Sequence, residues 1–298
     1  MDLDEWRHRG RYVKADGREL FLMDTDPAGE RTQTIFFIHG FPTAGWDFHR
    51  LVPGLQTDYR LVVPDMLGFG FSDKPKGHDY SIHEQADLLE AVIEGLDLGR
   101  FHVLAHDYGD SVAQEMLARE NAKPRAECRW LSLCLLNGGL FPETHHARLS
   151  QKLLHGPLGP VIGRLMSRGT LERNLRAVFG PQTPPSAEEL DAFWTLITEN
   201  RGDAIAHRLI RYIRDRRRHR ERWVQALRAA AIPIQLINGS MDPVSGAHMV
   251  ARYRELVSRR DIVELPRIGH YPQVEAPEEV LAHYRAFLDA HFPAGENA

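Results

Sequence analysis

The chain alternates between short, uninterrupted apolar runs and longer segments with helical periodicity. Runs such as Ile35–Ile38 lack the polar residue at every second position that a half-exposed strand would show, so strands buried on both faces are expected. The segment Ile82–Leu96 repeats apolar residues at helical spacing, and Ser81 with Glu84 predicts a capping box at its start. This alternation predicts an α/β protein whose mostly parallel sheet is covered by helices on both faces.

The expected elements follow from the same runs. Strands are predicted at Glu19–Met23, Thr34–His39, Arg60–Pro64, Phe101–His106, Trp130–Asn137, Ile234–Asn238 and Asp261–Leu265. Helices are predicted directly after Asp107, over Ala247–Val257 and over Pro277–Ala290.

The alternation stops after Asn137 and resumes at Ile232–Ile237. Residues 142–228 read as helices and turns, and an insertion at this place would lie above the carboxyl ends of the strands, where open α/β sheets bind ligands. We therefore predict a core formed by residues 1–141 and 229–298, with a helical cap at 142–228. Within the cap, Arg214–Arg222 is strongly basic; we interpret it as a solvated helix face with interleaved acids, and an anion or nucleic-acid patch is the alternative.

Bulk properties limit the partners and the compartment. The formal net charge of -4 gives no general attraction to nucleic acid or to an anionic membrane. Two cysteines, Cys128 and Cys134, allow at most one bridge, which points to a reducing compartment. The first residues are acidic where a secretion signal needs basic and then apolar residues, and no apolar run approaches the ~20 residues that span a bilayer. A soluble cytoplasmic protein without a membrane anchor is expected, as a monomer or a homodimer.

The segment Val103–Ser111 carries the strongest chemical signal. A buried strand ends at His106, a helix begins near Tyr108, and small residues lie two positions before and two after Asp107. This is the layout of a nucleophile elbow, a strained turn whose central side chain projects into a pocket. The central residue here is an aspartate. The alternatives are that Asp107 only caps the helix that it opens, or that Ser111 is the nucleophile.

A nucleophile of this type needs a histidine base and an acid that orients the base, in the chain order nucleophile, acid, histidine. Asp242 follows the strand that ends at Asn238, and His270 lies in the loop after the last strand. Both therefore fall at the carboxyl edge of the sheet, and we predict Asp107, Asp242 and His270 as the catalytic triad. Glu143 and Asn137 are weaker candidates for the acid.

Charge that develops on an ester oxygen must be met by fixed N–H donors. In this architecture the donors are backbone groups of the residue after the nucleophile and of the loop after an earlier strand, which assigns Tyr108 and Phe41. His39 is predicted to support that loop at the edge of the pocket. The scattered histidines lack metal-ligand spacing, so neither a metal nor another cofactor is predicted.

These motifs resemble the epoxide hydrolase and haloalkane dehalogenase branch of the α/β-hydrolase superfamily, and within it the family of mesoderm-specific transcript proteins. The resemblance lies in His39–Pro42, Pro64–Pro75, His106–Glu115, Ser132–Thr144 and Gly269–Gln273. It implies an α/β-hydrolase fold with an eight-stranded, mostly parallel sheet and an inserted helical cap. It also implies that the Asp107 carboxylate attacks an sp³ carbon to form an ester, which water activated by His270 then hydrolyses.

The resemblance also separates possible leaving groups. Halide-binding relatives usually carry a Trp after the nucleophile and a Trp or Asn nearby, whereas this chain has Tyr108 and Phe41. Epoxide hydrolases use cap tyrosines as proton donors, and Tyr212 lies where one of them is expected; a second donor could be His155, Trp194 or water. We therefore expect an epoxide hydrolase, with a haloalkane dehalogenase or a non-catalytic binding protein as alternatives.

The expected reactants are an apolar small molecule and water. Candidate pocket residues, all near the predicted cap or the Phe41 loop, are His39, Phe141, Phe193 and Trp194.

Overall fold

The computed structural model describes residues 1–146, 148–156, 159–164, 167–258 and 261–293. Eight strands form one sheet in the order β1-β2-β4-β3-β5-β6-β7-β8. The strands are β1 (Gly10–Ala15), β2 (Arg18–Asp24), β3 (Thr34–Ile38), β4 (Arg60–Pro64), β5 (Phe101–His106), β6 (Trp130–Leu136), β7 (Ile234–Gly239) and β8 (Ile262–Leu265). The β1–β2 and β2–β4 pairs are antiparallel and the other pairs are parallel, so the predicted α/β architecture with a mostly parallel sheet is confirmed.

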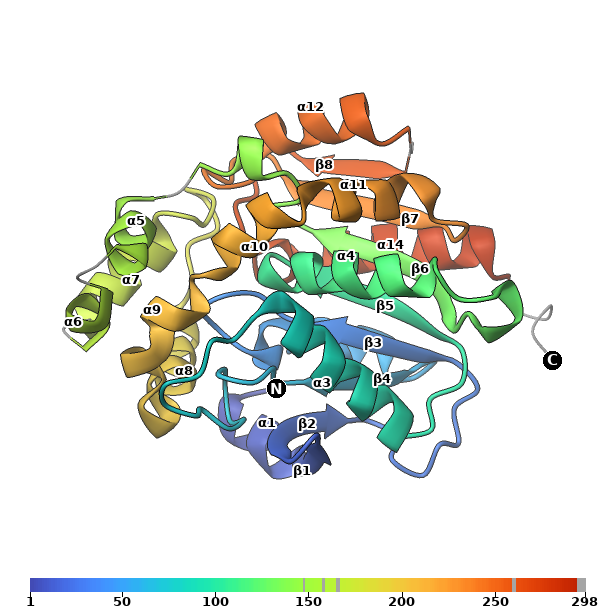
Figure 1. Ribbon diagram of the computed structural model, residues 1–298, viewed down its shortest axis with the longest axis horizontal. Coiled ribbons are helices and arrows are strands. Elements are labelled where there is room, and N and C mark those ends of the chain that lie inside the picture. Colours follow the sequence, from blue (N-terminus) through green and yellow to red (C-terminus); the bar gives the residue numbers. More distant parts are fainter. Residues whose placement is uncertain (147, 157–158, 165–166, 259–260, 294–298) are drawn as a thin grey trace.

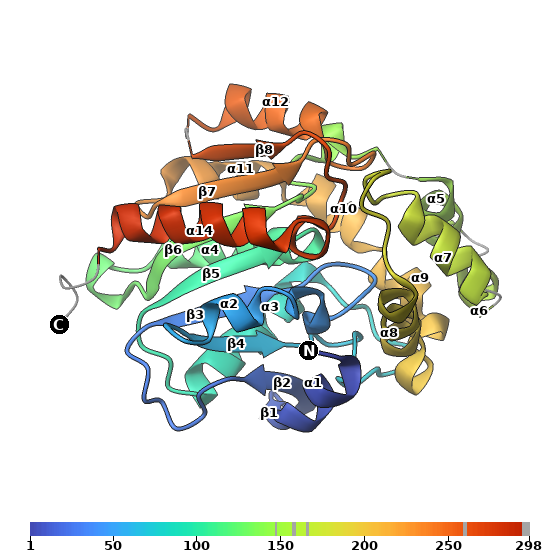
Figure 2. The ribbon, with the colours of Figure 1, turned by 180° about the vertical axis from the view of Figure 1, so that it is seen from behind.

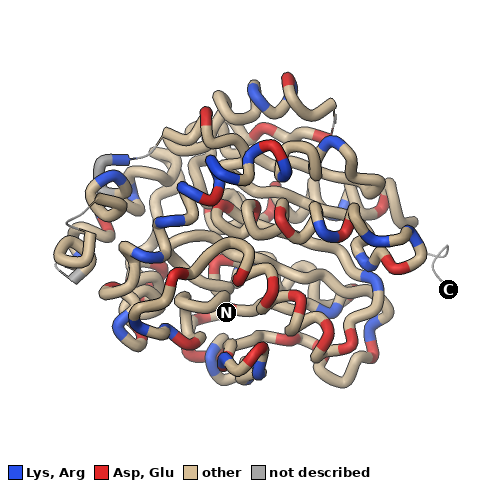
Figure 3. Tube along the Cα trace, in the orientation of Figure 1, with Lys and Arg blue, Asp and Glu red and all other residues tan. Residues whose placement is uncertain are grey.

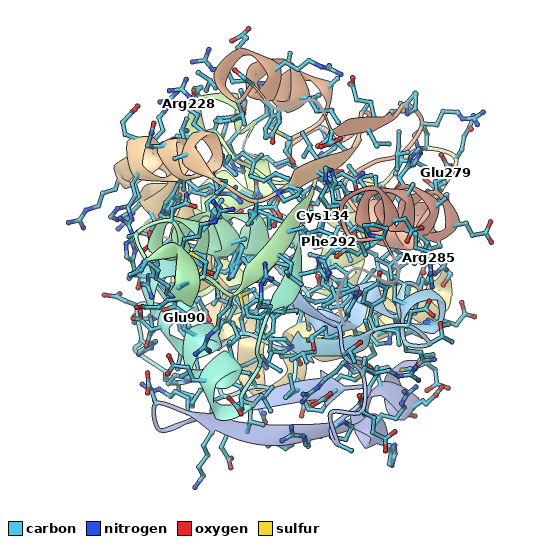
Figure 4. All side chains as sticks on the ribbon, turned by 90° about the vertical axis from the view of Figure 1, so that its right-hand side faces the viewer. Glu90, Cys134, Arg228, Glu279, Arg285 and Phe292 are labelled. Carbon is cyan, nitrogen blue, oxygen red and sulfur yellow. The ribbon has the colours of Figure 1, made fainter. Side chains whose placement is uncertain are left out.

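Helices cover both faces of this sheet (Figures 1 and 2). The α-helices outside the β6–β7 connection are α1 (Leu3–Arg9), α2 (Val52–Leu55), α3 (Ile82–Gly95), α4 (Tyr108–Glu120), α12 (Ala247–Leu256), α13 (Pro272–Glu275) and α14 (Pro277–His291). Short 3-10 helices are η1 (Gly45–Phe48) and η2 (Arg125–Glu127). Seen from one end of the strands, α14 with Glu279 and Arg285 lies on one side of the sheet, and Glu90 of α3 and Arg228 lie on the other (Figure 4).

The buried strands divide their side chains between two apolar cores. Phe36 and Ile38 of β3 belong to the core under α3 and α4, whereas Ile35 and Phe37 belong to the core under α14. Successive strand residues point to opposite faces, so a run without polar positions supplies both cores at once. This explains why the uninterrupted apolar runs predicted the interior strands within one residue at each end.

Two features of the first 95 residues were not predicted correctly. Strand β1 was missed because it is a sheet edge with mostly exposed or half-exposed residues, and it therefore lacks an apolar run. The predicted capping box is half right: the Ser81 hydroxyl accepts a hydrogen bond from the Glu84 N–H at 3.2 Å. The Glu84 carboxylate, however, lies 2.6 Å from Nε2 of His78, and this contact competes with the backbone N–H of Ser81.

Between β6 and β7, the described part of the chain consists of helices and turns and contains no strand. We call residues 142–229 the cap segment. It holds η3 (Pro142–Thr144), α5 (Leu149–His155), α6 (Gly159–Arg164), α7 (Arg168–Arg176), α8 (Ala187–Thr198), η4 (Glu199–Ile205), α9 (Ala206–Leu209), α10 (Tyr212–Arg218) and α11 (Arg220–Ala229). Helices α5 to α9 stand together at one end of the sheet, whereas α11 packs beside α4 (Figure 1). The division into a core and a separate cap domain stays a prediction.

None of the described helices is long and apolar enough to cross a membrane.

Candidate active site

The turn between β5 and α4 places Asp107 at the carboxyl edge of the sheet. Its backbone angles are φ 48° and ψ −103°, a strained combination that costs about 1–3 kcal/mol and persists only where surrounding structure imposes it. The turn is tightly packed, because a Cβ added at Gly109 would lie 2.2 Å from the carbonyl oxygen of Ile38. The small residue two positions after Asp107 is therefore a steric requirement.

The Asp107 side chain does not cap the helix that it precedes. Its carboxylate turns toward the loop after β3, where Oδ2 accepts a hydrogen bond from the Phe41 N–H at 3.1 Å. The residue is 3% exposed. The geometry thus disagrees with the capping alternative and matches a carboxylate that projects from an elbow.

His270 lies between the two predicted aspartates. Its Nδ1 is 2.7 Å from Oδ2 of Asp242, and its Nε2 is 4.0 Å from Oδ1 of Asp107. Because Nδ1 is held by a carboxylate, Nε2 is the ring nitrogen that faces Asp107. Asp107, Asp242 and His270 follow the carboxyl ends of β5, β7 and β8. In the sheet, β6 lies between β5 and β7, and β8 lies beside β7.

The protonation of this group is governed by its buried charges. Burial alone would lower the pKa of His270, but the carboxylates of Asp242 and Asp107 outweigh it and raise the pKa to about 9. Burial would raise the pKa of Asp242, but His270 and several hydrogen bonds lower it to about 2. For Asp107, burial is likewise outweighed by the positive charges of His270 and Arg216, so its pKa lies below the usual value. Before any substrate binds, the Asp107 carboxylate is therefore ionised.

Of the two predicted oxyanion donors, the Phe41 N–H has a contact with Asp107, because it donates a hydrogen bond to an oxygen of that carboxylate. Tyr108 is the first residue of α4, next to Asp107, and its ring is fully buried. The role of its backbone N–H stays a prediction.

Tyr212 lies on α10 and is 1% exposed. Its ring centroid is 6.0 Å from that of Phe41 and 5.0 Å from that of Tyr108, so the side chain stands above the elbow. Burial raises the pKa of its hydroxyl, which keeps the phenol protonated. Its role as a proton donor stays a prediction.

A covered cavity of about 130 Å³ lies above Asp107 and His270. Most of its wall is apolar and comes from the cap segment. The apolar cap residues that line it are Leu154, Leu171, Leu175, Val178, Leu196, Ile197, Ala206 and Leu209. Phe41 and Phe69 line it from the core, and Gln151 and Asn174 add polar groups.

Comparisons with known proteins identify the family and the fold. The sequence model of the α/β-hydrolase fold matches residues 33–129. The mesoderm-specific transcript homolog protein of Homo sapiens is 40% identical over 295 residues, which cover 97% of this chain and 88% of that protein. The chain belongs to the α/β-hydrolase family.

Two further proteins are similar to this α/β-hydrolase, one in sequence and one in structure. A cis-3-alkyl-4-alkyloxetan-2-one decarboxylase of Shewanella oneidensis is 24% identical over 292 residues, covering 93% of this chain and 87% of that protein. The crystal structure of a loop variant of a haloalkane dehalogenase from Bradyrhizobium elkanii superposes with a TM-score of 0.77 and 21% identity, covering 95% and 96% of the two chains.

The four predicted pocket residues do not line this cavity. Among the described residues that line the cavity, His39, Phe141, Phe193 and Trp194 are absent. His39 is buried under the loop, where its Nε2 accepts a hydrogen bond from the Met66 N–H at 3.0 Å. Phe141 and Phe193 belong to the two apolar cores, and Trp194 packs beside one of them. Aromatic residues near a pocket are as useful in the core as in its wall, and sequence position does not separate the two uses.

The interpretation of Arg214–Arg222 as a solvated face needs a correction at one residue. Basic and acidic residues are mixed along α10 and α11 (Figure 3). Arg217 and Arg218 are exposed. Arg216, however, is only 2% exposed, and its guanidinium contacts the elbow. An arginine in a basic run is ordinarily solvated, so its neighbours in the sequence gave no reason to single it out.

Two supporting residues of the acid were also missed. Asn137 donates to Oδ2 of Asp242 at 3.0 Å, and Ser245 donates to the same oxygen at 2.7 Å. Asn137 has φ 43° at the end of β6, a conformation that asparagine tolerates better than most residues. An asparagine that directly follows a buried strand, as in Asn137-Gly138-Gly139, was the available signal for such a position.

Proposed function

We propose that this α/β-hydrolase opens an apolar epoxide by forming an ester on Asp107 and then hydrolyses that ester with water. One observation carries the proposal: the ionised Asp107 carboxylate projects from a strained elbow beneath an apolar cavity, with His270 beside it. A carboxylate is already charged at neutral pH and therefore attacks carbon without first losing a proton to a base.

In the proposed first step, one oxygen of Asp107 forms a bond to a ring carbon of the epoxide. The bond from that carbon to the ring oxygen breaks, and the ring oxygen takes the electron pair. A proton donor then neutralises the oxygen, and the protonated hydroxyl of Tyr212, above the elbow, is the candidate.

In the proposed second step, water attacks the carbonyl carbon of the ester and gives its proton to Nε2 of His270. The negative oxygen that results is held by the Phe41 N–H, which contacts Oδ2 in the resting site. The bond from the carbonyl carbon to the alkylated oxygen then breaks, the protonated His270 gives its proton to the departing oxygen, and the diol leaves with an oxygen that belonged to Asp107. Water thereby restores the carboxylate.

The first test follows that oxygen atom. Enzyme in excess over styrene oxide is run for one turnover in ¹⁸O-labelled water, and the diol is analysed by mass spectrometry. The proposal expects an unlabelled diol from the first turnover and ¹⁸O in Asp107. Label in the first diol would mean that water attacks the epoxide directly, and the ester mechanism would be wrong.

The second test traps the ester. His270→Gln removes the base of the second step only, so styrene oxide should add its mass once to the Asp107 peptide while diol formation stops. His283→Gln, an exposed histidine on α14, is the matched control and should leave turnover unchanged. A His270→Gln protein that stays unmodified by every epoxide tried would favour the non-catalytic binding protein.

A strained four-membered lactone is the second candidate substrate. The oxetanone decarboxylase of Shewanella oneidensis favours it, because that relative is named for such a substrate. The carboxylate that such a ring releases requires no proton donor. A panel of epoxides, 2-oxetanones and haloalkanes, each run with wild type and Asp107→Ala, separates the candidates. If haloalkanes are the only compounds of the panel that react, and they release halide, the activity is dehalogenation instead.

A further inference from the structure

Arg216 reaches from the cap segment to the nucleophile. Its Nε donates to the hydroxyl of Ser111 at 2.6 Å, and its Nη2 donates to the backbone oxygen of Asp107 at 2.9 Å. The same Nη2 lies 3.5 Å from Oδ1 of Asp107. A buried guanidinium is costly unless it is paired, so these contacts hold the cation in one place.

The surroundings are shaped to admit this side chain. The guanidinium carbon lies 4.5 Å from the centre of the Tyr212 ring, a cation–π arrangement. On another side, a Cβ added at Gly139 would lie 2.2 Å from Nη1 of Arg216, so only glycine leaves room there. The cap segment and the core therefore both contribute to the site of this cation.

The two oxygens of Asp107 have different neighbours. Oδ2 is held by the Phe41 N–H. Oδ1 faces Nε2 of His270 at 4.0 Å and Nη2 of Arg216 at 3.5 Å. Under the proposed function, on which this step rests, Oδ1 is the oxygen left to attack, and it becomes the bridging oxygen of the ester.

We propose that Arg216 is a further catalytic residue, a cation supplied by the cap segment that stabilises negative charge on Oδ1 of Asp107 in both steps. Before attack it favours the ionised nucleophile. When the ester is hydrolysed, the bond from Cγ to Oδ1 breaks and its electron pair goes to Oδ1, where the same cation stabilises the developing alkoxide. In the same step His270, which has taken the proton of water, gives that proton to the departing oxygen.

Several other titratable groups surround this pair. Asp242 adds negative charge, whereas burial raises the pKa of the Asp110 carboxyl group well above its usual value. His270 and His106 stand beside Asp107, and His145 and Tyr212 lie near Arg216. Removal of Arg216 would leave Asp107 buried, with the charge of His270 and the Phe41 N–H as its main remaining partners. The Asp107 carboxylate should then bind a proton more readily.

The first experiment needs no substrate. The Asp107 carboxylate is titrated by ¹³C NMR in protein labelled at the aspartate side-chain carboxyl carbon, and its resonance is identified by its loss in Asp107→Asn. Arg216→Gln should raise the apparent pKa of Asp107 by about one unit or more. Arg218→Gln, the same change at an exposed position of α10, should leave it unchanged. An unshifted titration in folded Arg216→Gln would overturn the electrostatic role.

Two variants separate charge from simple bracing of the elbow. Arg216→Lys keeps the charge and loses the forked hydrogen bonds, whereas Ser111→Ala removes the partner of Nε and keeps the charge. Both should hold the pKa of Asp107 nearer to the wild-type value than Arg216→Gln does. If Arg216→Gln fails to fold, Arg216→Lys still decides, because a rise of about one unit or more in the Asp107 pKa in this variant, which keeps the charge, would mean that bracing matters and charge does not.

The second experiment measures the two steps with styrene oxide by rapid quench and mass spectrometry of the intact protein. Arg216→Gln should slow hydrolysis of the Asp107 ester at least tenfold and slow its formation less, because the carboxylate stays ionised at neutral pH; Arg216→Lys should recover part of the hydrolysis rate. Ester hydrolysis at the wild-type rate in Arg216→Gln would overturn the role in the second step. If wild type forms no ester, the proposed function fails, while the NMR titration still decides whether Arg216 stabilises the Asp107 charge.

Discussion

The charge on Asp107 and the proton on His270 depend on each other, because each side chain lies in the field of the other. Asp107 is one of the groups that raise the pKa of His270 to about 9. In the resting enzyme His270 is therefore protonated at neutral pH, which does not suit a base. Esterification would remove the Asp107 charge, and the pKa of His270 should then fall to a value that suits its task.

We predict that Asp107→Asn, which mimics the uncharged ester, lowers the pKa of His270 by about one unit or more. The sign follows from the lost attraction: without the Asp107 charge the imidazolium is less stable, so the proton leaves at lower pH. ¹⁵N NMR of the histidine side chains across pH 5 to 10 measures the shift. Equal pKa values in the two proteins would show that the residues are not coupled.

The orienting acid can be tested at the same scale. Asp242→Asn keeps the shape of the side chain but removes the charge and can present an N–H to Nδ1 of His270, which favours the wrong tautomer. We expect kcat to fall by about 10²–10⁴, with ester hydrolysis slowed more than ester formation. Single-turnover rates for each step provide the check, and equal slowing of both steps would argue against this role.

At the scale of elements, α4 connects the elbow to α11 through Glu115. This carboxylate accepts hydrogen bonds from the Trp223 Nε1–H at 2.8 Å and from Arg222 and Arg119 at 2.9 and 3.0 Å. Burial would raise the pKa of Glu115, but these partners lower it to about 2. One residue of α4 thus holds the last helix of the cap segment beside the helix that carries the elbow.

Glu115→Ala should destabilise the fold by about 3 kcal/mol, because it leaves the buried Trp223 N–H and one face of the Arg222–Arg119 cluster unpaired. Urea unfolding measures the loss. Glu94→Ala, at an exposed position of α3, is the control and should change the free energy of unfolding by less than about 0.5 kcal/mol. If Glu115→Ala lowers the free energy of unfolding no more than Glu94→Ala does, water compensates for all the lost Glu115 contacts and the prediction is wrong.

At the scale of the whole molecule, the interior contains several neutral histidines. Burial lowers the pKa of His39 to about 3 and those of His49, His102 and His106 to about 4. They occupy the loop after β3, η1 and its flank, and both ends of β5. Their common effect is to make the folded state bind fewer protons than the unfolded chain in mild acid.

We therefore predict that each of these histidines makes the hydrolase less stable at pH 5 than at pH 7. The folded pKa values lie below the ordinary value near 6.5, so this stability is present above about pH 6.5 and is lost as pH falls toward 4. His270 and the buried carboxyl groups of Asp47, Asp65 and Asp110, whose pKa values are raised, act in the opposite direction, so the test isolates one histidine. Urea unfolding of wild type and His102→Gln at the two pH values should show the variant gaining on the order of 1–2 kcal/mol relative to wild type at pH 5. An equal difference between the two proteins at pH 5 and pH 7 would contradict the prediction.

Local patterns in the chain were sufficient for the interior strands, the elbow at Asp107 and the order of Asp107, Asp242 and His270 along the sheet edge. Each follows from backbone periodicity or from where a strand ends, and these are properties of neighbouring residues. The edge strand β1 left no comparable signal because solvent, not the core, selects most of its side chains.

The surroundings of the site depend on contacts between residues far apart in the chain. Arg216 lies 109 positions from Asp107, and Asn137 lies 105 positions from Asp242. Whether Arg216 meets water or the elbow, and whether Phe193 faces a cavity or a core, is set by how the cap segment packs on the sheet. No periodicity within either segment encodes that packing, because the partner of each side chain is supplied by a distant part of the chain.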